Sequence, residues 1–272
     1  MKFKISFACD EDLLKEKLKV RSERPSAAAP CRSVVQVRFP GRGMSRAYYN
    51  DRFDLKPGDL VYVDGKLEGQ CGRVLEVHYN FKIKISDYKR VIARVDTEVN
   101  GRFYHAGSHF VTFDNNVLPP RQAALWFRAP VREDEEFVSG RDESSFCLAD
   151  LRGMDVSVDC VERGREYCED NRVRYLSVDG GRGYAVVEGR AAYEVEFEYR
   201  GGQISNLTCS CFCSGTCKHA VAAMLQLKKL LETIGQNHAA AYEQTGYFAA
   251  VEKETLFRNA LAGKETGSLV LD

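Results

Sequence analysis

The sequence lacks both long apolar runs and an excess of charge of either sign. No run of eighteen apolar residues occurs in the 272-residue chain, which argues against a transmembrane helix. The first residues, 1–7, mix lysines with a short apolar burst and lead straight into acidic residues 10–12, unlike a secretory signal peptide. We therefore expect a cytoplasmic protein without membrane contact. The formal net charge of zero argues against wholesale wrapping by nucleic acid but is compatible with a local basic face.

Familiar catalytic signatures are also missing. The chain has no recognisable Ser-His-Asp set, no paired catalytic carboxylates and no nucleotide-binding fingerprint. The glycine-rich stretch 180–183 lacks the Lys-Ser/Thr pair of a phosphate-binding loop, and we expect it to join two strands. His105 and His109 flank a Gly-Ser pair typical of a loop, so we expect them to be structural. Triads assemble in space from distant residues, and the absence of these local signatures favours a non-catalytic protein.

Cysteine, in contrast, is concentrated in one place. Four of the ten cysteines and one histidine lie in the stretch Cys209-Ser-Cys211-Phe-Cys213-Ser-Gly-Thr-Cys217-Lys-His219. In a reducing compartment these cysteines are not expected to form disulfides. Redox thiols of low pKa do occur at helix N-termini, but several thiols and an imidazole at this spacing fit a metal better. Zinc prefers thiolate and imidazole ligands in a tetrahedron, so the stretch predicts one structural zinc ion.

The pattern C-x-C, five residues, C-x-H supplies three thiolates and one imidazole. Cys209 and Cys211 are two apart at an expected strand end, so their side chains point to the same face. Residues 214–216, Ser-Gly-Thr, are typical of a turn that returns the chain to Cys217 and His219 at the start of a helix. The positive end of that helix favours the net negative charge of a site with three thiolates.

Cys213 leaves the ligand set open. Cys211, Cys213, Cys217 and His219 also form a C-x-C, C-x-H pattern, with a gap of three residues in place of five. We prefer Cys209 to Cys213 because the tighter loop leaves less room for the turn. Cys213 is then a spare thiol, and a thiol-dependent enzyme that uses Cys213 as its nucleophile or redox group is one alternative function.

This motif and the residues before it resemble a SWIM zinc finger. The resemblance covers about residues 162–234 and includes the expected strands 172–178 and 193–199 with their Gly-Gly turns. It departs from the family at Phe212-Cys213, where the second ligand is often followed by proline. The family implies a structural zinc and binding to DNA or to proteins, and it implies no particular reaction.

The stretch 193–199 alternates apolar and acidic side chains. Its apolar residues face one way, and Glu194, Glu196 and Glu198 face the other, as in an antiparallel strand with one solvent-exposed face. Such an acidic face suits a protein partner better than a nucleic acid. It supports the alternative of a protein–protein interaction adaptor within a larger assembly, for example one that contains a helicase.

A helix is expected after the metal motif. Apolar residues follow helical spacing over 221–234, and Gly235 is the expected C-cap. We expect this helix to pack on the preceding hairpins, with a second helical stretch over 238–262 and a loose tail over 263–272. Together these elements predict a zinc-finger domain over 155–262.

Short strands dominate the prediction for the N-terminal half. We expect an N-terminal segment and linker over 1–32, with a short helix at 11–20, and a β-rich, barrel-like domain over 33–145. Residues 33–95 loosely resemble small SH3-like barrels and the N-terminal domain of primosomal helicases. The overall prediction is an α+β fold, a small antiparallel β-barrel followed by a β-hairpin-plus-helix zinc finger. The expected strands are 34–39, 60–63, 72–77, 81–85 and 90–95, with a hairpin over 103–113.

Basic residues near aromatic ones suit phosphates and stacked bases. The stretch 32–50 contains several arginines and no acid, and two lysines share one face of the expected strand 81–85. Further lysines accompany the metal motif. We therefore expect nucleic acid, preferably DNA, as the partner. The candidate contacts are Arg38, Lys82, Lys84, Lys218, Lys228 and Lys229.

Overall fold

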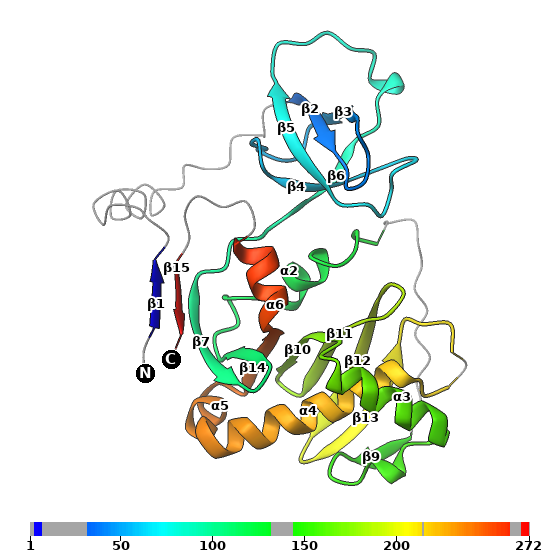
Figure 1. Cartoon of the computed structure of the whole chain (residues 1–272), viewed down its shortest axis with the longest axis vertical. Helices are drawn as coiled ribbons and strands as arrows, with labels where there is room; N and C mark the ends of the chain where they lie inside the picture. Colours follow the sequence, from blue (N-terminus) through cyan, green and yellow to red (C-terminus); the bar gives the residue numbers. More distant parts are fainter. Residues whose placement is uncertain (1–2, 7–31, 132–143, 214, 262–267, 272) are drawn as a thin grey trace.

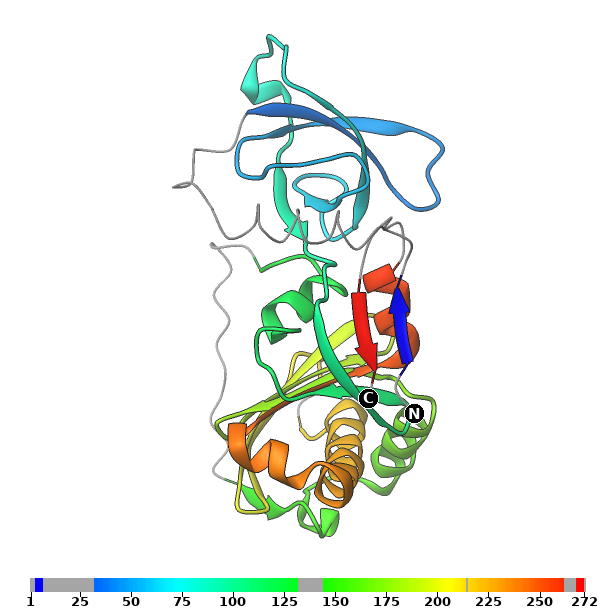
Figure 2. The ribbon, with the colours of Figure 1, turned by 90° about the vertical axis from the view of Figure 1, so that its left-hand side faces the viewer.

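The computed structural model describes residues 3–6, 32–131, 144–213, 215–261 and 268–271. They form two β-sheets with helices around the larger one, so the fold is α+β, as the sequence predicts (Figure 1). Both views place the smaller sheet at one end of the molecule, with helix α2 (Pro120–Leu125) between the two sheets (Figures 1 and 2). Within the described residues, no helix has the length and apolar character needed to cross a bilayer.

The smaller sheet has five strands in the order β3-β2-β5-β4-β6, and all neighbours are antiparallel. Among the described residues, no ladder joins the edge strands β3 and β6, and a single isolated bridge links Tyr49 to Arg90, the residue before β6. The sheet is therefore open where the sequence predicts a closed barrel, and the likeness to SH3-like and primosomal-helicase barrels is not supported. The strands are β2 (Ser33–Arg38), β3 (Ser45–Asn50), β4 (Leu60–Val63), β5 (Gly72–His78) and β6 (Val91–Val95).

Residues 81–85 do not form the strand that their alternating sequence predicts. Residues 81–84 form a loop that leads into the short 3-10 helix η1 (Ile85–Asp87). The ring of Phe81 packs edge-on against Tyr49, with ring centroids 6.3 Å apart. This tertiary contact buries the apolar side chain while the backbone forms a loop. Strand propensity depends strongly on tertiary context, so the alternating sequence alone does not determine a strand here.

The larger sheet has ten strands in the order β1-β15-β7-β8-β14-β10-β11-β12-β13-β9. All neighbours are antiparallel except β15 and β7. Strands β7 and β8 form the hairpin expected over 103–113, and β8 pairs with β14, so they share a sheet with the zinc-finger strands. The strands are β1 (Phe3–Ser6), β7 (Gly101–Ala106), β8 (His109–Thr112), β9 (Ser145–Cys147), β10 (Val173–Asp179), β11 (Arg182–Glu188), β12 (Ala192–Arg200), β13 (Gln203–Cys209), β14 (Tyr247–Glu252) and β15 (Ser268–Leu271).

The two ends of the chain meet in this sheet. Strand β1 pairs antiparallel with β15, so the tail expected to be loose over 263–272 contains a strand. The helix expected at 11–20 lies outside the described residues, as does the linker up to residue 31.

Helices cover both faces of the ten-stranded sheet. Helices α3 (Val158–Glu169) and α4 (Lys218–Asn237) lie side by side on one face, and α2 and α6 (Lys253–Leu256) lie on the other (Figures 1 and 2). Val195 and Phe197 of β12 are buried in the core on the α4 side, which confirms the alternation predicted for 193–199. Each face therefore has its own apolar core, one of them built around the helix that follows the metal motif.

Helix α4 begins at Lys218, as predicted, but it continues through Gly235 to Asn237. The C-cap is His238, whose N–H donates to the carbonyl of Ile234 at 2.7 Å. The prediction of a helical stretch over 238–262 is wrong for its middle residues, 247–252, which form a strand. Helix α5 (Ala239–Thr245) ends at Gly246, which has a φ of 63°, and β14 follows before α6 and the π-helical turn η3 (Phe257–Leu261).

The apolar run of β14 explains this error. All six of its residues are buried because the strand lies between β8 and β10 with a helix-covered core on each face. A short run that is apolar on both faces cannot be told from a buried helix by periodicity alone. The sheet, and not the local sequence, decides its conformation.

Candidate metal centre

A β-hairpin holds the first pair of metal-motif residues. Strands β12 and β13 pair antiparallel, and Cys209 at the end of β13 lies opposite Val195. Ser210 extends the pairing by one residue: its N–H donates to the carbonyl of Glu194 at 2.9 Å, and its Oγ accepts from the Glu194 N–H at 2.9 Å. These bonds fix the chain directly after Cys209, between the first two cysteines of the motif.

The start of helix α4 holds the second pair. Cys217 is the N-cap residue in extended conformation, so it lies just outside the helix, and His219 lies in the first turn. Residues two apart on a regular helix would point in nearly opposite directions. The extended Cys217 removes that restriction, and both side chains reach the hairpin.

The four side chains converge. One ligand atom from each of Cys209, Cys211, Cys217 and His219 lies within 4.8 Å of the others. Nδ1 of His219 is 3.7 Å from Sγ of Cys217 and 3.9 Å from Sγ of Cys209. A tetrahedral zinc ion with bonds of about 2.3 Å to sulfur and 2.0 Å to nitrogen has edges of about 3.5–3.8 Å between its ligands. The two separations from His219 are close to that size, and the 4.8 Å bound on the whole set is within about 1 Å of it.

The electrostatics of the cluster favour a thiolate at Cys217. Hydrogen bonds from the Cys209 thiol, then from His219 and the backbone N–H of Ala220, lower the pKa of Cys217 to about 3 against the opposing effect of burial. Burial raises the pKa of Cys211 to about 11, and the neighbouring Cys217 thiolate raises that of Cys209. Metal ligands must be deprotonated, so zinc binding releases protons chiefly from the latter two thiols.

Aromatic rings enclose the imidazole. Tyr193 of β12 stacks on His219, with ring centroids 4.2 Å apart and planes 21° apart, and Tyr167 of α3 meets it edge-on at 5.6 Å. Nε2 of His219 is buried without a hydrogen-bond partner among the described residues. A Cβ at Gly189 would lie 3.3 Å from this atom and 2.9 Å from the Tyr193 ring. The imidazole is thus held by packing, with Nδ1 as the nitrogen that faces the thiols.

Cys213 lies outside the cluster. It is exposed, and its neighbour Phe212 has a fully exposed ring. The structure therefore brings together the ligand set with Cys209 and leaves Cys213 as the spare thiol. The serine at position 214 lies outside the described residues.

The lysines of the metal motif separate in space. Nζ of Lys218 lies 4.7 Å from the centre of the Tyr167 ring, beside the cluster. Lys228 and Lys229 follow ten and eleven residues later, about 15 Å further along α4. Nζ of Lys228 donates to the carbonyl of Ala149 at 3.0 Å. Of the three, only Lys218 lies near the metal ligands.

The remaining candidate contacts also separate. Arg38 lies opposite Arg73 at the start of β5. Lys82 and Lys84 come after its end at His78, about 17 Å away along the strand, and both are exposed. Since residues 81–84 form a loop, these lysines do not share a sheet face, and Nζ of Lys84 lies 4.0 Å from the carboxylate of Asp87.

Sequence reasoning missed Tyr167, Tyr193 and Arg172 as neighbours of the metal site. The guanidinium of Arg172 lies 4.9 Å from the centre of the Tyr167 ring, on which Lys218 also lies. Tyr167 comes from α3, a helix that the sequence analysis did not predict. Ser157 is the available signal, because its Oγ accepts the backbone N–H of Cys160 and caps this helix.

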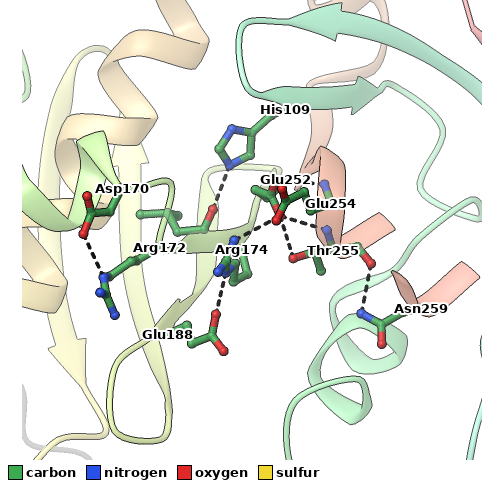
Figure 3. Close-up of polar contacts among 10 residues, drawn as sticks. His109, Asp170, Arg172, Arg174, Glu188, Glu252, Glu254, Thr255 and Asn259 are labelled. Atoms are coloured by element: carbon green, nitrogen blue, oxygen red, sulfur yellow. Dashed lines mark hydrogen bonds and ion pairs between the residues drawn. The ribbon is translucent and has the colours of Figure 1, made fainter. Parts of the chain in front are cut away.

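A second polar cluster is structural. Arg174 of β10 bonds Glu188 at 2.6 Å and Glu252 at 3.1 Å, and Glu252 in turn accepts from Thr255 at the start of α6 (Figure 3). Burial raises the pKa of Glu252, but the bonds from Glu254, Thr255 and Arg174 outweigh it and leave the pKa below its ordinary value. These groups satisfy one another and tie three elements of the larger sheet together.

His109 belongs to the same region. Its Nε2 lies 2.7 Å from the carbonyl oxygen of Val173 (Figure 3). Its Nδ1 lies 3.0 Å from Oγ of Ser108. Complete burial lowers its pKa to about 4, so the ring is neutral at pH 7 and donates from Nε2 to the carbonyl. The structural role predicted for His109 fits these contacts, although the residue lies in strand β8 and not in a loop.

Comparison with known proteins supports the metal assignment. Residues 193–228 match the family model of the SWIM zinc finger, and this span contains the hairpin β12–β13, the four ligands and the first half of α4. Searches of curated proteins and of solved structures find no match. The chain thus carries a SWIM zinc finger whose Cys209, Cys211, Cys217 and His219 form a site for one zinc ion.

Proposed function

We propose that this protein is a zinc-stabilised, non-catalytic nucleic-acid-binding protein, with DNA as the preferred partner. One observation carries the proposal: Lys218 and Arg172 both place their cations over the ring of Tyr167, directly beside the metal site. Cations held next to an aromatic face suit a phosphate backbone and its bases. The zinc ion fixes the start of α4, and with it the position of Lys218.

The proposed role of zinc is structural. Three cysteines and one histidine fill a tetrahedron and leave no open position for water or substrate. When bound, the ion supplies folding free energy by joining the end of β13 to the start of α4. At the start of α4, Cys217, His219 and Ala220 are buried, and Lys218 is the residue of this first turn that is partly exposed.

The charges near the site agree with an anionic partner. Arg190 is exposed and follows Gly189, whose Cβ position would lie 3.3 Å from Nε2 of His219. Nε of Arg172 lies 3.3 Å from a carboxylate oxygen of Asp170, the two side chains are 40% and 60% exposed, and ion pairs this accessible to solvent contribute little. Asp170 therefore leaves Arg172 able to exchange its partner for a phosphate.

The alternative is a protein–protein interaction adaptor. The fully exposed ring of Phe212 favours this alternative, since a single exposed aromatic side chain is a frequent anchor in protein interfaces. The acidic face of β12 favours it less than the sequence suggests. Glu194 accepts from the Tyr184 hydroxyl at 2.6 Å and pairs with Arg128 at 2.8 Å, and Glu198 lies 3.7 Å from Arg200. Two of the three carboxylates are thus already engaged within the chain.

A salt series tests the proposal. We would measure the fluorescence anisotropy of labelled single-stranded and duplex DNA, and of matching RNA, with the zinc-loaded full chain between about 50 and 200 mM salt. The affinity should fall steeply with salt. The double variant Lys218→Gln, Arg172→Gln should weaken binding and reduce the salt slope by about two, because two phosphates would no longer be neutralised.

Lys229→Gln is the matched control. It removes one charge from the exposed side of the same helix, about 16 Å from Lys218, and should leave the slope unchanged. Zinc content should stay at one per chain in all three proteins. Absent or salt-independent binding would contradict a nucleic-acid partner, and capture of a defined protein through Phe212 would then favour the adaptor.

A further inference from the structure

A basic cavity lies on the five-stranded sheet, away from the metal motif in sequence. It has a volume of about 680 Å³ and is lined by β2, the β2–β3 loop, β4 and β5. Arg38, Arg42 and Arg73 contribute its charges, and no aspartate or glutamate lines it. Phe39, Leu60 and Leu75 form its apolar wall.

Arg38 and Arg73 are direct cross-strand partners. In an antiparallel pair such residues have Cβ atoms about 5 Å apart, and like charges placed opposite each other are destabilising. Arg73 donates from Nη1 to the carbonyl of Gly58 at 3.0 Å. Within the described part of the chain, none of the three arginines forms an ion pair with a carboxylate. The described residues therefore place no carboxylate against this pair, and the carbonyl of Gly58 is the internal acceptor that Arg73 has.

The strand register explains why no helix covers this part of the sheet. Arg38, Arg73, Leu60 and Val95 form one row across β2, β5, β4 and β6 on the same face. At the Val95 end, this face packs against Leu125 and Trp126 of the α2 region. Helix α2 thus covers the half of the face with apolar residues, and the half with arginines stays uncovered.

The β2–β3 loop closes one side of the cavity and brings in the third arginine. Arg42 lies between Gly41, which has a φ of 71°, and Gly43, and no atom lies within 4 Å of the Cβ position of either glycine. The absence of side chains on both sides of Arg42 lets a ligand approach the backbone closely. Exposed Leu75, at 40%, adds an apolar surface next to the charges.

We propose that this cavity binds the phosphodiester backbone of a single nucleic-acid strand, as a second contact of the nucleic-acid-binding function on which the proposal rests. Guanidinium groups bind phosphate oxygens through two parallel hydrogen bonds, and a bound phosphate would neutralise the opposed Arg38 and Arg73. The cavity has the volume of one or two nucleotides, with Leu75 against a base. A rigid duplex is too wide to enter it, whereas a flexible strand can.

The test uses the zinc-loaded full chain and a labelled oligothymidylate. Arg38→Gln with Arg73→Gln should reduce the affinity for the single strand by about tenfold or more at moderate salt and lower the salt slope. The same double variant should keep or raise the thermal midpoint of the free protein, because it removes a like-charge pair. A purely structural role for the two arginines would lower that midpoint.

Arg46→Gln is the matched control. Arg46 lies opposite Val37, on the other face of the same hairpin, and should affect neither binding nor melting. Two competitors identify the source of the phosphate. Thymidine monophosphate and a duplex of the same length should each compete far less well than the unlabelled single strand. A duplex or a mononucleotide that competes equally well would overturn the single-strand assignment.

The outcomes separate this inference from the proposed function. Salt-dependent binding by the unchanged protein, together with equal binding by the Arg38/Arg73 double variant, would overturn the cavity and leave the metal-site face as the binding surface. Absence of nucleic-acid binding by the unchanged protein would overturn both. Loss of binding in the double variant with an intact Arg46→Gln control supports the cavity.

Discussion

The ring of Tyr193 lies against the ring of His219, with centroids 4.2 Å apart and planes 21° apart. Tyr193 comes from the first strand of the finger and His219 from the helix that follows it, so this contact joins the two elements that the metal also joins. Nε2 of His219 has no hydrogen-bond partner among the described residues. Stacking therefore does the orienting that a hydrogen bond to the second ring nitrogen usually does for a metal-bound histidine.

Removing this ring should weaken zinc binding. We expect Tyr193→Ala to lower the zinc affinity about 10–100-fold, the range found when the partner that orients a ligand is removed. Tyr193→Phe should bind zinc like the unchanged protein, because the contact uses the ring face and not the hydroxyl. Competition with a chromophoric chelator measures both. Tyr79→Ala, at an exposed tyrosine directly after β5 of the other sheet, is the control, and equal losses at Tyr79 and Tyr193 would contradict the stacking role.

Serine substitutions should separate the ligands from the spare thiol. Cys209→Ser, Cys211→Ser and Cys217→Ser should each reduce the bound zinc well below one per chain, because each removes one corner of the tetrahedron. Cys213→Ser should keep one zinc per chain, since Cys213 is exposed and outside the cluster. Metal content of the purified proteins provides the measurement. Zinc loss in Cys213→Ser, with full content in Cys209→Ser, would assign the alternative set.

The close approach of α3 and α4 should depend on Gly164. A Cβ at this position would lie 2.5 Å from Cγ1 of Val221 and 3.1 Å from the carbonyl of Lys218. We expect Gly164→Ala to destabilise the fold by about 1–3 kcal/mol and to weaken zinc binding, because it pushes the start of α4 away. Urea unfolding with zinc present measures the first effect.

Gly235→Ala is its matched control. This glycine lies in the interior of α4, is exposed, and has no atom within 4 Å of its Cβ position. Alanine there should stabilise the helix by about 0.5–1 kcal/mol. If both substitutions changed stability in the same direction, the steric explanation for Gly164 would fail.

The metal ligands could be predicted from the sequence because their chemistry is local. The four ligands lie within eleven residues: Cys209, Cys211, Cys217 and His219. The spacing of the thiols and the imidazole indicates the type of metal and the two chain segments that hold it. The alternation over 193–199 was readable for the same reason, since each residue's face follows from its neighbours. Both the metal ligation and the strand alternation are determined by residues close together in the sequence.

The features that the sequence analysis missed depend on residues far apart in the chain. Tyr167 reaches the metal site from α3, and the strand β14 is fixed by its neighbours β8 and β10. The opposed pair of Arg38 and Arg73 follows from strand register, which joins positions 35 residues apart. Hydrophobic periodicity carries no information on such pairings. The alternating residues 81–85 therefore read as a strand, and nothing local indicated that Arg38 would lie beside Arg73 in a basic cavity.

The ion pair of Arg174 with Glu252 should contribute to stability at neutral pH. We expect Glu252→Gln to destabilise the fold by about 2–3 kcal/mol, since it leaves the half-buried Arg174 with Glu188 alone and weakens the cap of α6. Its lowered pKa means that this contribution is present above the ordinary pKa of a glutamate and is lost as the pH falls. Glu254→Gln, at an exposed position of the same helix, should change little, and similar losses from both would contradict the assignment.

The buried His109 should make the stability depend on pH over a different window. Its pKa is about 4 in the folded chain, because burial disfavours the charged ring, and about 6.5 when the chain is unfolded. Between these values the unfolded state binds more protons, so the stability rises with pH across the window and is fully present above about pH 6.5. The groups that face the ring do not reverse this sign: Glu252 raises the pKa, whereas Arg174 and Lys253 lower it.

Replacing His109 by glutamine should remove that dependence. Urea unfolding of the unchanged protein and of His109→Gln, at matched zinc concentration from about pH 7.5 to pH 4, gives two curves whose difference isolates this ring, since the zinc site is common to both. The difference should be flat above about pH 6.5 and should change by up to about 3 kcal/mol as the pH falls toward 4. Glutamine can still donate to the carbonyl of Val173, so loss of the hydrogen bond at 2.7 Å is not the cause of the change. A difference that stays constant over the whole range would show that His109 does not titrate between the two states.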